Sequence, residues 1–307
     1  VRIFFIARNY RNKSTKKVSK TRRKHTFCFC LRNLCYLWIL NYGILASNTK
    51  IYFASDQHFG APTKELSFPR EKKFVAWLDE IKKDATALFL LGDLFDFWFE
   101  YKNAIPKGFI RLQGKLAELS DRGIELIIFT GNHDIWIFDY FTKEMGVKVY
   151  RDPQQYSIQT PAQTNPMKLY IAHGDGLGPG DNGYKVLKRV FENKVCQWAF
   201  SWLHPHVGIS LAHWWSGSRK DPERIKKELV FKGKDEWLLN HTLEVEQQQH
   251  FDYYIFGHRH LLLDLAVGET GARYINLGEW CYDSAKTSYH YAVWDGSTMQ
   301  IESALNV

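Results

Sequence analysis

Aspartate, histidine and asparagine recur in five short motifs along the chain. In sequence order these are Asp56-Gln57-His58, Gly92-Asp93-Leu94-Phe95-Asp96, Gly131-Asn132-His133-Asp134, His173-Gly174-Asp175 and Gly257-His258-Arg259-His260. Their side chains offer imidazole nitrogens, carboxylates and an amide oxygen, but no thiolate. Such a donor set suits Mn²⁺, Fe²⁺ or Zn²⁺ better than Ca²⁺ or a structural zinc ion.

The number of donors predicts two ions rather than one. The candidate ligands are Asp56, His58, Asp93, Asn132, His173, His258 and His260. Seven ligands exceed the usual protein set of one ion, so two ions that share a bridging carboxylate are the simplest arrangement. Two divalent ions about 4 Å apart can activate water and hold the oxygens of a phosphoryl group during an in-line displacement. The motifs therefore predict a dinuclear metal centre, whose chemistry would suit a phosphoryl group.

Turns and a metal-free catalytic set are the two alternatives to a metal site. Asp, Asn and Gly are common in strand-to-helix turns for backbone reasons, so one such motif alone is most simply a turn. Five in succession are hard to obtain as turns. A Ser-His-Asp or Cys-His catalytic set would need no metal, but the chain has no GxSxG elbow, and neither Cys196 nor Cys281 lies in a recognisable nucleophile motif.

Each motif directly follows a short apolar run of buried-strand length. The predicted strands are Ile51–Ser55, Ala87–Leu91, Glu125–Thr130, Leu169–Ala172, Tyr253–Phe256 and Tyr274–Leu277. Apolar stripes with helical spacing lie at 74–81 and 110–119. Alternating strands and helices predict an α/β fold, in which ligands collect beyond the carboxyl ends of the strands. The five motifs are therefore expected at one edge.

The net charge of +8 is unevenly distributed. Residues 1–50 contain twelve Lys/Arg and no acid, so the remaining 257 residues carry a net charge of −4. A nuclease needs a basic groove, and a mildly acidic body argues against binding to a phosphate backbone. Five cysteines without a CxxC pair predict neither a disulfide framework nor a zinc ribbon.

Residues 1–49 are predicted to be an N-terminal extension of a domain that covers residues 50–307. Their apolar run, Leu34–Ala46, is shorter than the roughly 18–20 residues needed to span a bilayer. The segment is interpreted as a signal sequence, as a basic arm that touches anionic lipid, or as a wrongly extended translation. The third interpretation is favoured because composition changes abruptly at Lys50, and the segment is expected to be disordered.

The five motifs, in this order, resemble the signature of the calcineurin-like metallophosphoesterases, and they cover residues 50–278. The resemblance implies a four-layer αββα sandwich of two mixed sheets and a dinuclear metal centre. It assigns the first ion to Asp56, His58, Asp93 and His260, and the second to Asp93, Asn132, His173 and His258. It also implies that His133 stabilises or protonates the leaving-group oxygen and that Asp134 orients His133.

An insertion at 176–233 lies between the fourth and fifth motifs and is predicted to form two helices that act as a lid. It is rich in aromatic and basic residues, which suits an amphiphilic phosphate. The alternative is that its aromatic residues, among them Trp198, Trp202 and Trp214, only pack the insertion against its own domain. His204-Pro205-His206, with metal-like spacing, is more simply a proline-made turn.

The insertion, together with Asp181 and the Leu277-Gly278-Glu279-Trp280 segment, is similar to the UDP-2,3-diacylglucosamine diphosphatases of lipid A biosynthesis. That family cleaves its substrate to UMP and 2,3-diacylglucosamine 1-phosphate at the cytoplasmic face of the inner membrane, usually with Mn²⁺. The resemblance implies a peripheral membrane enzyme with no nucleic-acid partner and no obligate protein partner. The substrate contacts that it implies are Asn132, His133, Asp181, Trp202, Ser216, Ser218, Arg219 and Lys220. His133 is a departure, because well-known members carry Arg there.

Two further functions are compatible with the sequence. A phosphodiesterase or nucleotide phosphatase of the same superfamily would share the metal ligands but would not need an aromatic lid. A scaffold that keeps the fold without catalysis is the non-enzymatic alternative, and such relatives typically lose ligands that are all present in this sequence.

Overall fold

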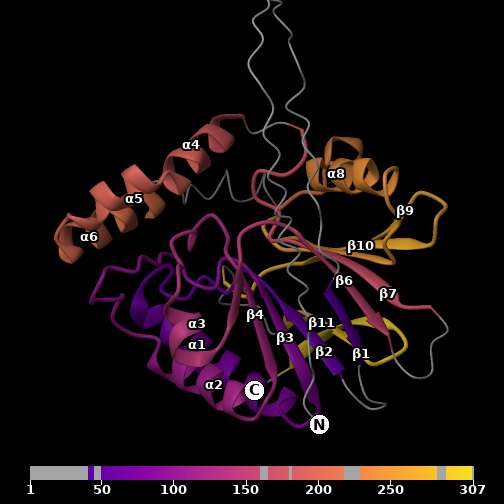
Figure 1. Ribbon diagram of the computed structural model, residues 1–307, viewed down its shortest axis with the longest axis horizontal. Helices are drawn as coiled ribbons and strands as arrows, with labels where there is room; N and C mark the ends of the chain where they lie inside the picture. The colour runs from indigo at the N-terminus through magenta and orange to yellow at the C-terminus, as the bar shows by residue number, and fades with distance from the viewer. Residues whose placement is uncertain are drawn as a thin grey trace, which may run out of the picture.

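Two mixed β-sheets packed face to face form the centre of the protein (Figure 1). The structure, a computed structural model, describes residues 41–44, 50–159, 165–179, 182–217, 229–281 and 288–305. The first sheet has the strand order β12 (Met299–Leu305), β11 (Ser288–Trp294), β2 (Lys50–Ala54), β3 (Ala85–Leu91), β4 (Glu125–Phe129) and β5 (Lys148–Tyr150). Its strands β2 to β5 run parallel, while β11 is antiparallel to both of its neighbours.

The second sheet has the strand order β1 (Asn41–Ile44), β6 (Gln154–Gln159), β7 (Met167–Ile171), β8 (Tyr253–Phe256), β10 (Ala272–Leu277) and β9 (Leu262–Val267). Its central strands β7, β8 and β10 are parallel, and β6 and β9 pair antiparallel on either side of them. Strand β1 comes from the N-terminal segment and pairs parallel with β6. The rest of residues 1–49 lies outside the described residues, so the domain boundary at residue 50 stays a prediction.

Apolar side chains fill the space between the sheets and the space beneath the helices. Phe53, Phe89, Leu169 and Ile255 belong to the cluster between the two sheets. On the outer face of the first sheet lie α1 (Lys64–Ile81), α2 (Ile110–Asp121) and α3 (Tyr140–Met145), and on that of the second lies α8 (Trp237–Glu246) (Figure 1). The order of helices, sheet, sheet and helix confirms the predicted four-layer sandwich.

Helix α1 shows how the predicted stripe becomes core. Thr63 caps its first turn by accepting a hydrogen bond from the Leu66 amide. Phe74, Trp77 and Leu78 then fall on one face and are buried against the first sheet. Because only nine residues separate the end of β2 from the helix, its first turn lies near the edge where that strand delivers Asp56 and His58.

The insertion contains three helices among its described residues rather than the two that were expected. These are α4 (Asn182–Glu192), α5 (Lys194–Ser201) and α6 (Pro205–Gly217), and Figure 1 shows them as a row projecting from the sandwich. Asn193 follows α4 and caps α5 by accepting hydrogen bonds from two amides of that helix. Pro205 opens α6, so the His204-Pro205-His206 motif is a helix start.

Candidate metal centre and the adjoining pocket

The candidate ligands occupy backbone conformations that residues other than glycine seldom adopt. The φ angle is 57° at Asp56, 43° at His58, 50° at Asp93, 68° at His258 and 52° at His260. Such left-handed positions cost about 1–3 kcal/mol each, and they persist at functional sites where the surrounding structure enforces them. The sharp turns follow the carboxyl ends of strands in both sheets, so the motifs converge from two sheets rather than from one.

The first predicted metal site is assembled in the structure. Ligand atoms of Asp56, His58, Asp93 and His260 lie within 4.8 Å of one another. His260 Nε2 is 3.2 Å from Asp56 Oδ1, and His58 Nε2 is 3.5 Å from Asp93 Oδ2. Asp56, His58 and Asp93 are buried, and His260 is partly buried. Two carboxylates and two imidazoles therefore face one small space.

The second predicted site shares Asp93 with the first. Asp93 Oδ2 is 3.6 Å from His173 Nε2, and the rings of His173 and His258 lie 5.1 Å apart. His173 Nε2 and Asn132 Oδ1 are buried and have no hydrogen-bond partner. A buried polar atom without a partner is costly, so both atoms are suited to a ligand that the protein itself does not supply.

These observations fit two divalent metal ions. Nitrogen and oxygen donors surround the carboxylate of Asp93 on both sides, and two of the donor atoms lack a hydrogen-bond partner. The donor set without sulfur matches the chemistry of Mn²⁺, Fe²⁺ or Zn²⁺. Asp93 is positioned to bridge the two sites.

Neighbouring groups hold the imidazoles in the orientation that a ligand needs. His173 Nδ1 lies 2.6 Å from the Leu91 carbonyl oxygen, which can only accept, so this nitrogen carries the proton and Nε2 is free to bind metal. His260 Nδ1 lies 3.0 Å from Glu279 Oε2. This carboxylate orients the His260 ring in the first site, as the Leu91 carbonyl orients the His173 ring in the second. The His258 amide donates to Asp56 Oδ2 at 2.9 Å and fixes that carboxylate.

Glycine is required where the motif turns pass closest to the ligands. A Cβ atom at Gly131 would overlap the Asp93 carboxylate and stand 2.6 Å from the Asp93 amide nitrogen. A Cβ atom at Gly92 would stand 2.6 Å from Cγ of His173, and one at Gly257 would be 2.5 Å from Asp56 Oδ2. Protein atoms essentially never approach so closely. The glycines of three motifs therefore make room for the ligands.

His133 lies beside the metal ligands, but its partner is not the expected one. Its Nδ1 is 3.0 Å from the Asp96 carbonyl oxygen and 3.5 Å from Asp96 Oδ1, so Asp96 orients the ring. The carboxylate of Asp134 instead accepts from the amides of Leu94, at 2.8 Å, and Gly131, at 2.7 Å. Asp134 thus joins two motif turns through their backbones, which corrects its predicted contact with the His133 ring.

Mutual charge dominates the electrostatics of the ligands. Burial alone would raise the pKa of Asp93, but neighbouring imidazoles, His173 foremost, hold it well below its usual value. Burial alone would lower the pKa of His173, yet the charge of Asp93 raises it to about 10. Burial would also lower the pKa of His260, and the carboxylates of Asp56 and Glu279 raise it to about 10. Both imidazoles therefore hold protons that a metal would displace.

For the other two ligand histidines, His58 and His258, burial outweighs the neighbouring carboxylates and lowers the pKa. Burial and the charge of His173 lower the pKa of His258 to about 4, so His258 is neutral at physiological pH. Burial, followed by the charge of Asp93, raises the pKa of the Asp134 carboxyl to about 7.

An apolar cavity of about 380 Å³ opens directly beside Asn132 and His133. One wall comes from the loops that follow β3 and β4, and the other from helices α4, α5 and α6. The lining residues are Asp96, Phe97, Asn132, His133, Ile135, Trp136, Tyr184, Leu187, Val190, Phe191, Cys196, Gln197, Phe200 and Leu211. Its volume is within the range of small-molecule sites. The helices of the insertion thus cover an apolar space next to the candidate metal centre, the position expected of the predicted lid.

Aromatic contacts tie the lid to the body. The Phe200 ring packs against Trp136 and Phe99 with centroid distances of 4.9 and 4.7 Å, and the Trp136 indole donates to the Phe191 carbonyl oxygen at 2.9 Å. The root of α4 is held by Asp175, which accepts from the Tyr184 hydroxyl at 2.6 Å. These contacts fix the cavity walls relative to His173, two residues before Asp175.

The sequence matches a known family along most of its length. Residues 49–262 match the family model described as calcineurin-like phosphoesterase. The chain belongs to the calcineurin-like phosphoesterase family. A protein from Porphyromonas gingivalis named UDP-2,3-diacylglucosamine hydrolase is 37% identical over 268 residues, which cover 83% of this chain and 97% of that protein.

More distant matches are found among both sequences and solved structures. A protein of the same name from Haemophilus influenzae strain PittGG is 25% identical over 232 residues, covering 75% of this chain and 90% of its own. Among solved structures, the phosphoesterase Yfce from E. coli is 17% identical, with a TM-score of 0.39 over 82% of this chain and 91% of its own. That structure is too dissimilar to support any statement about activity.

The structure of this phosphoesterase brings together six of the predicted metal ligands, with His133 beside them: Asp56, His58, Asp93, His173, His258 and His260. The seventh, Asn132, lies at the cavity wall next to His133. The structure does not bring Trp202 to the cavity: the side chain is 75% exposed, and its ring packs edge-on against Trp198, 5.9 Å away. The aromatic wall of the cavity comes instead from Trp136, Phe191 and Phe200. Asp181, Ser218, Arg219 and Lys220, and the side chains of Ser216 and Trp214, lie outside the described residues.

Two residues that hold parts of the site in place, Glu279 and Tyr184, were not predicted from the sequence. Glu279 carries no motif of its own, and its position within Leu277-Gly278-Glu279-Trp280 is the signal that could have drawn attention to it. Tyr184 is an ordinary residue of an amphipathic helix by sequence, and only the fold brings its hydroxyl to Asp175 and its ring to the cavity.

Proposed function

We propose that this phosphoesterase hydrolyses the pyrophosphate bond of UDP-2,3-diacylglucosamine, releasing UMP and 2,3-diacylglucosamine 1-phosphate. One observation carries the proposal: the apolar cavity under the lid adjoins Asn132 and His133 at the edge of the metal centre. A substrate that joins acyl chains to a pyrophosphate needs both environments side by side. Relatives named for hydrolysis of this compound support the choice.

We place two divalent ions, Mn²⁺ first among them, at the clustered ligands. Asp56, His58, Asp93 and His260 would hold one ion, and Asp93, Asn132, His173 and His258 the other. When bound, the ions would withdraw charge from the phosphoryl oxygens and lower the pKa of the attacking water. Asn132, at the cavity wall, is placed to contact the pyrophosphate as well.

His133 is suited to the departing oxygen of the lipid phosphate. Because the Asp96 carbonyl can only accept, Nδ1 of His133 carries a proton, and Nε2 is left for the substrate. A protonated ring would donate from Nε2 to the oxygen on which negative charge develops. The apolar walls of the cavity exclude bulk water from this side of the site, which strengthens that interaction.

The acyl chains of such a substrate reside in a membrane, so we also propose peripheral association with the cytoplasmic face of the inner membrane. Among the described residues, no helix combines the length and the apolar character needed to cross a bilayer. The remaining predicted substrate contacts, Asp181 with the glucosamine and Ser216 to Lys220 with the phosphate or nucleoside, are part of this proposal.

The proposal is tested by product analysis with three substrates. Purified protein with Mn²⁺ is given UDP-2,3-diacylglucosamine, UDP-glucosamine and bis(p-nitrophenyl) phosphate, and products are separated by thin-layer chromatography. We expect UMP and the lipid phosphate from the first substrate, with far slower turnover of the other two. Equal turnover of the acylated and deacylated nucleotides would indicate a general nucleotide phosphodiesterase. Absence of turnover in folded, metal-loaded protein would indicate a scaffold.

A further inference from the structure

Exposed apolar side chains gather where α1 and α2 begin. Leu66 is 64% exposed, Phe68 36% and Ile110 76%. The cations Lys64, Lys72, Lys107 and Arg111 are exposed around them. We refer to these seven residues as the tip patch. Single exposed apolar residues are ordinary on protein surfaces, but a group framed by cations is not.

Specific contacts hold the tip patch together. The Phe68 ring lies between two cations, with Lys72 Nζ and Arg111 Cζ each 4.7 Å from its centroid. Lys64 Nζ donates to the Lys107 carbonyl oxygen at 3.0 Å and joins the start of α1 to the loop before α2. The two helix starts therefore form one continuous surface.

The charge of this surface opposes that of the rest of the body. Residues 61–73 and 101–111 contain seven Lys/Arg and two acids, a net charge of +5, so the other residues of 51–307 together carry a net charge of −9. Glu71 is buried and accepts a hydrogen bond from the Leu112 amide, and Arg70 is buried and donates to the Ala61 carbonyl oxygen. Six of these cations and one of these acids are therefore exposed to solvent. A positive, apolar surface on an acidic body complements an anionic lipid surface.

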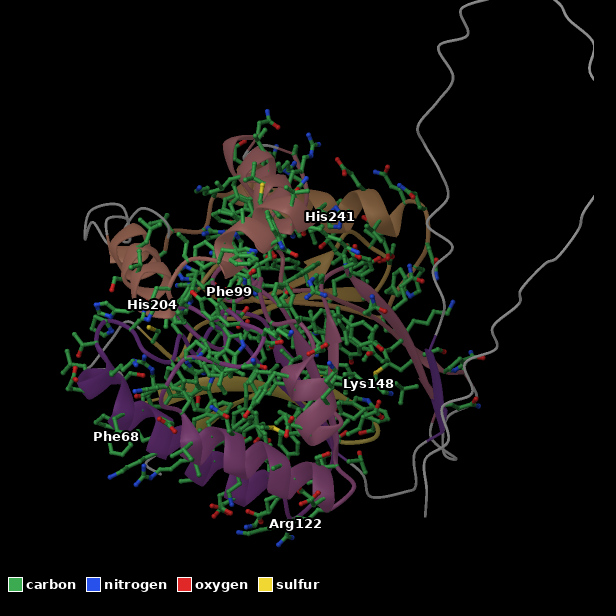
Figure 2. The ribbon with its side chains drawn as sticks, turned by 60° about the vertical axis from the view of Figure 1, so that its left-hand side comes forward. Phe68, Phe99, Arg122, Lys148, His204 and His241 are labelled. Carbon is green, nitrogen blue, oxygen red and sulfur yellow. The ribbon has the colours of Figure 1, made fainter. Side chains whose placement is uncertain are left out.

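The tip patch lies at the edge of the molecule that carries the active site. Helix α1 follows the loop that bears Asp56 and His58, and α2 follows the loop that bears Asp93 and Asp96. Figure 2 shows Phe68 and His204, at the start of lid helix α6, along the same side of the molecule, with Arg122 far from both. A bilayer in contact with the tip patch would thus lie close to the lid.

We infer that the tip patch docks the protein on an anionic phospholipid bilayer, an inference that rests on the proposed lipid substrate. Leu66, Phe68 and Ile110 enter the interfacial region, and the four cations face the lipid phosphates. Phe68 is suited to the headgroup level because the Lys72 ammonium and the Arg111 guanidinium lie over its ring and can face the lipid phosphates there.

Vesicle flotation tests the inference without any substrate. The full chain is mixed with vesicles of phosphatidylcholine alone or of phosphatidylcholine with phosphatidylglycerol. Two variants probe the tip patch, Leu66→Ser/Ile110→Ser and Lys72→Gln/Arg111→Gln. The matched controls are Leu243→Ser, an exposed residue of α8, and Lys83→Gln/Arg122→Gln, which removes the same charge from the opposite ends of α1 and α2. The basic N-terminal segment is common to all of them.

We expect wild-type protein to float with the anionic vesicles and to be released by salt. Each tip-patch variant should bind about tenfold more weakly or worse, as expected for two lost lipid contacts, and the controls should bind like wild type. Thermal melting must show that all variants are folded. Wild-type vesicle binding by the tip-patch variants, or equal loss in the controls, would overturn the inference and leave this surface for a protein partner. Because the vesicles contain no nucleotide lipid, failure of the proposed activity would not alter the result.

Discussion

Asp93 is the residue on which both halves of the metal centre depend, since His58 and His173 each face its carboxylate. Replacing it, as Asp93→Asn, removes the bridging charge while keeping the shape of the side chain. We expect activity to fall by orders of magnitude. The amount of bound metal should also fall, from about two ions per chain to fewer. Asp121→Asn, at the exposed end of α2, should change neither property. Full metal occupancy in Asp93→Asn would refute the bridging role.

Glu279 acts on the metal through His260. In Glu279→Gln the carboxylate 3.0 Å from His260 Nδ1 becomes neutral, so the imidazole becomes a weaker ligand. Mutation of a residue that hydrogen-bonds to a metal ligand typically weakens metal affinity about 10–100-fold. Calorimetric titration with Mn²⁺ should show a loss in that range. The melting temperature of the metal-free protein should also fall, because the charged His260 ring loses a buried partner. Affinity equal to that of wild type would show that Glu279 is only structural.

The cluster of candidate metal ligands was predictable because each residue lies in a polar motif that directly follows a continuous apolar strand. The sequence does not, however, indicate which group orients His133. Asp134 is its neighbour along the chain, but the turn after β4 sends that carboxylate to backbone amides, and Asp96 reaches the ring from the preceding motif. Such contacts depend on side-chain directions within tight turns.

At the scale of elements, the turn that contains Gly131 should tolerate no side chain. In Gly131→Ala the added methyl group would overlap the Asp93 carboxylate, so metal binding and activity should both be lost. Gly114→Ala is the matched control: nothing lies within 4 Å of its Cβ position in α2. Relief of the glycine penalty should stabilise that helix by about 0.5–1 kcal/mol. Thermal melts and metal analysis of both variants would check this contrast, and normal metal binding by Gly131→Ala would contradict it.

The lid should contribute through the helix face that lines the cavity and not through its exposed tryptophans. Leu187→Ala removes part of the cavity wall and should lower kcat/KM for the diacylated substrate. The lost apolar contact should raise the corresponding free-energy barrier by about 1–3 kcal/mol. Trp202→Ala, at an exposed position, should have little effect on detergent-dispersed substrate. Neither variant should alter turnover of a small phosphodiester. A larger loss for Trp202→Ala than for Leu187→Ala would reverse this assignment of the lid faces.

The strands that were predictable are three of the four inner strands of each sheet. Strands β2, β3, β4, β7, β8 and β10 are covered on both faces and appear as unbroken apolar runs. The outer strands carry polar residues on one face, as in β12, or are as short as β5, and their identity depends on the neighbour with which they pair. Sequence periodicity alone does not contain that information.

At the scale of the whole molecule, metal binding should be coupled to pH. The raised pKa values of His173 and His260, about 10 each, mean that both rings are protonated in the metal-free protein at neutral pH. A metal ion must displace these protons, so affinity should rise as the pH rises towards 10 and fall as the pH drops. Calorimetry with Mn²⁺ in buffers of different ionisation enthalpy should detect about two protons released per chain. Binding without proton release would contradict this account.

The charge pattern also acts on the whole molecule. A net-acidic body with a basic and apolar surface at the tip patch orients the active-site edge towards an anionic surface, a property that neither the overall charge of +8 nor any single motif reveals. Composition alone distinguishes the basic N-terminal segment from the body. The fold was needed to show that residues 61–73 and 101–111, far apart in sequence, form one surface.

The most direct test of the central claim is hydrolysis of UDP-2,3-diacylglucosamine by the Mn²⁺-loaded protein in ¹⁸O-labelled water, followed by phosphorus NMR. If His133 assists departure of the lipid phosphate, water attacks the phosphorus nearer to uridine. The label should then appear in UMP, and 2,3-diacylglucosamine 1-phosphate should remain unlabelled. Label in the sugar phosphate, or no cleavage by folded protein with both metal sites filled, would contradict the account.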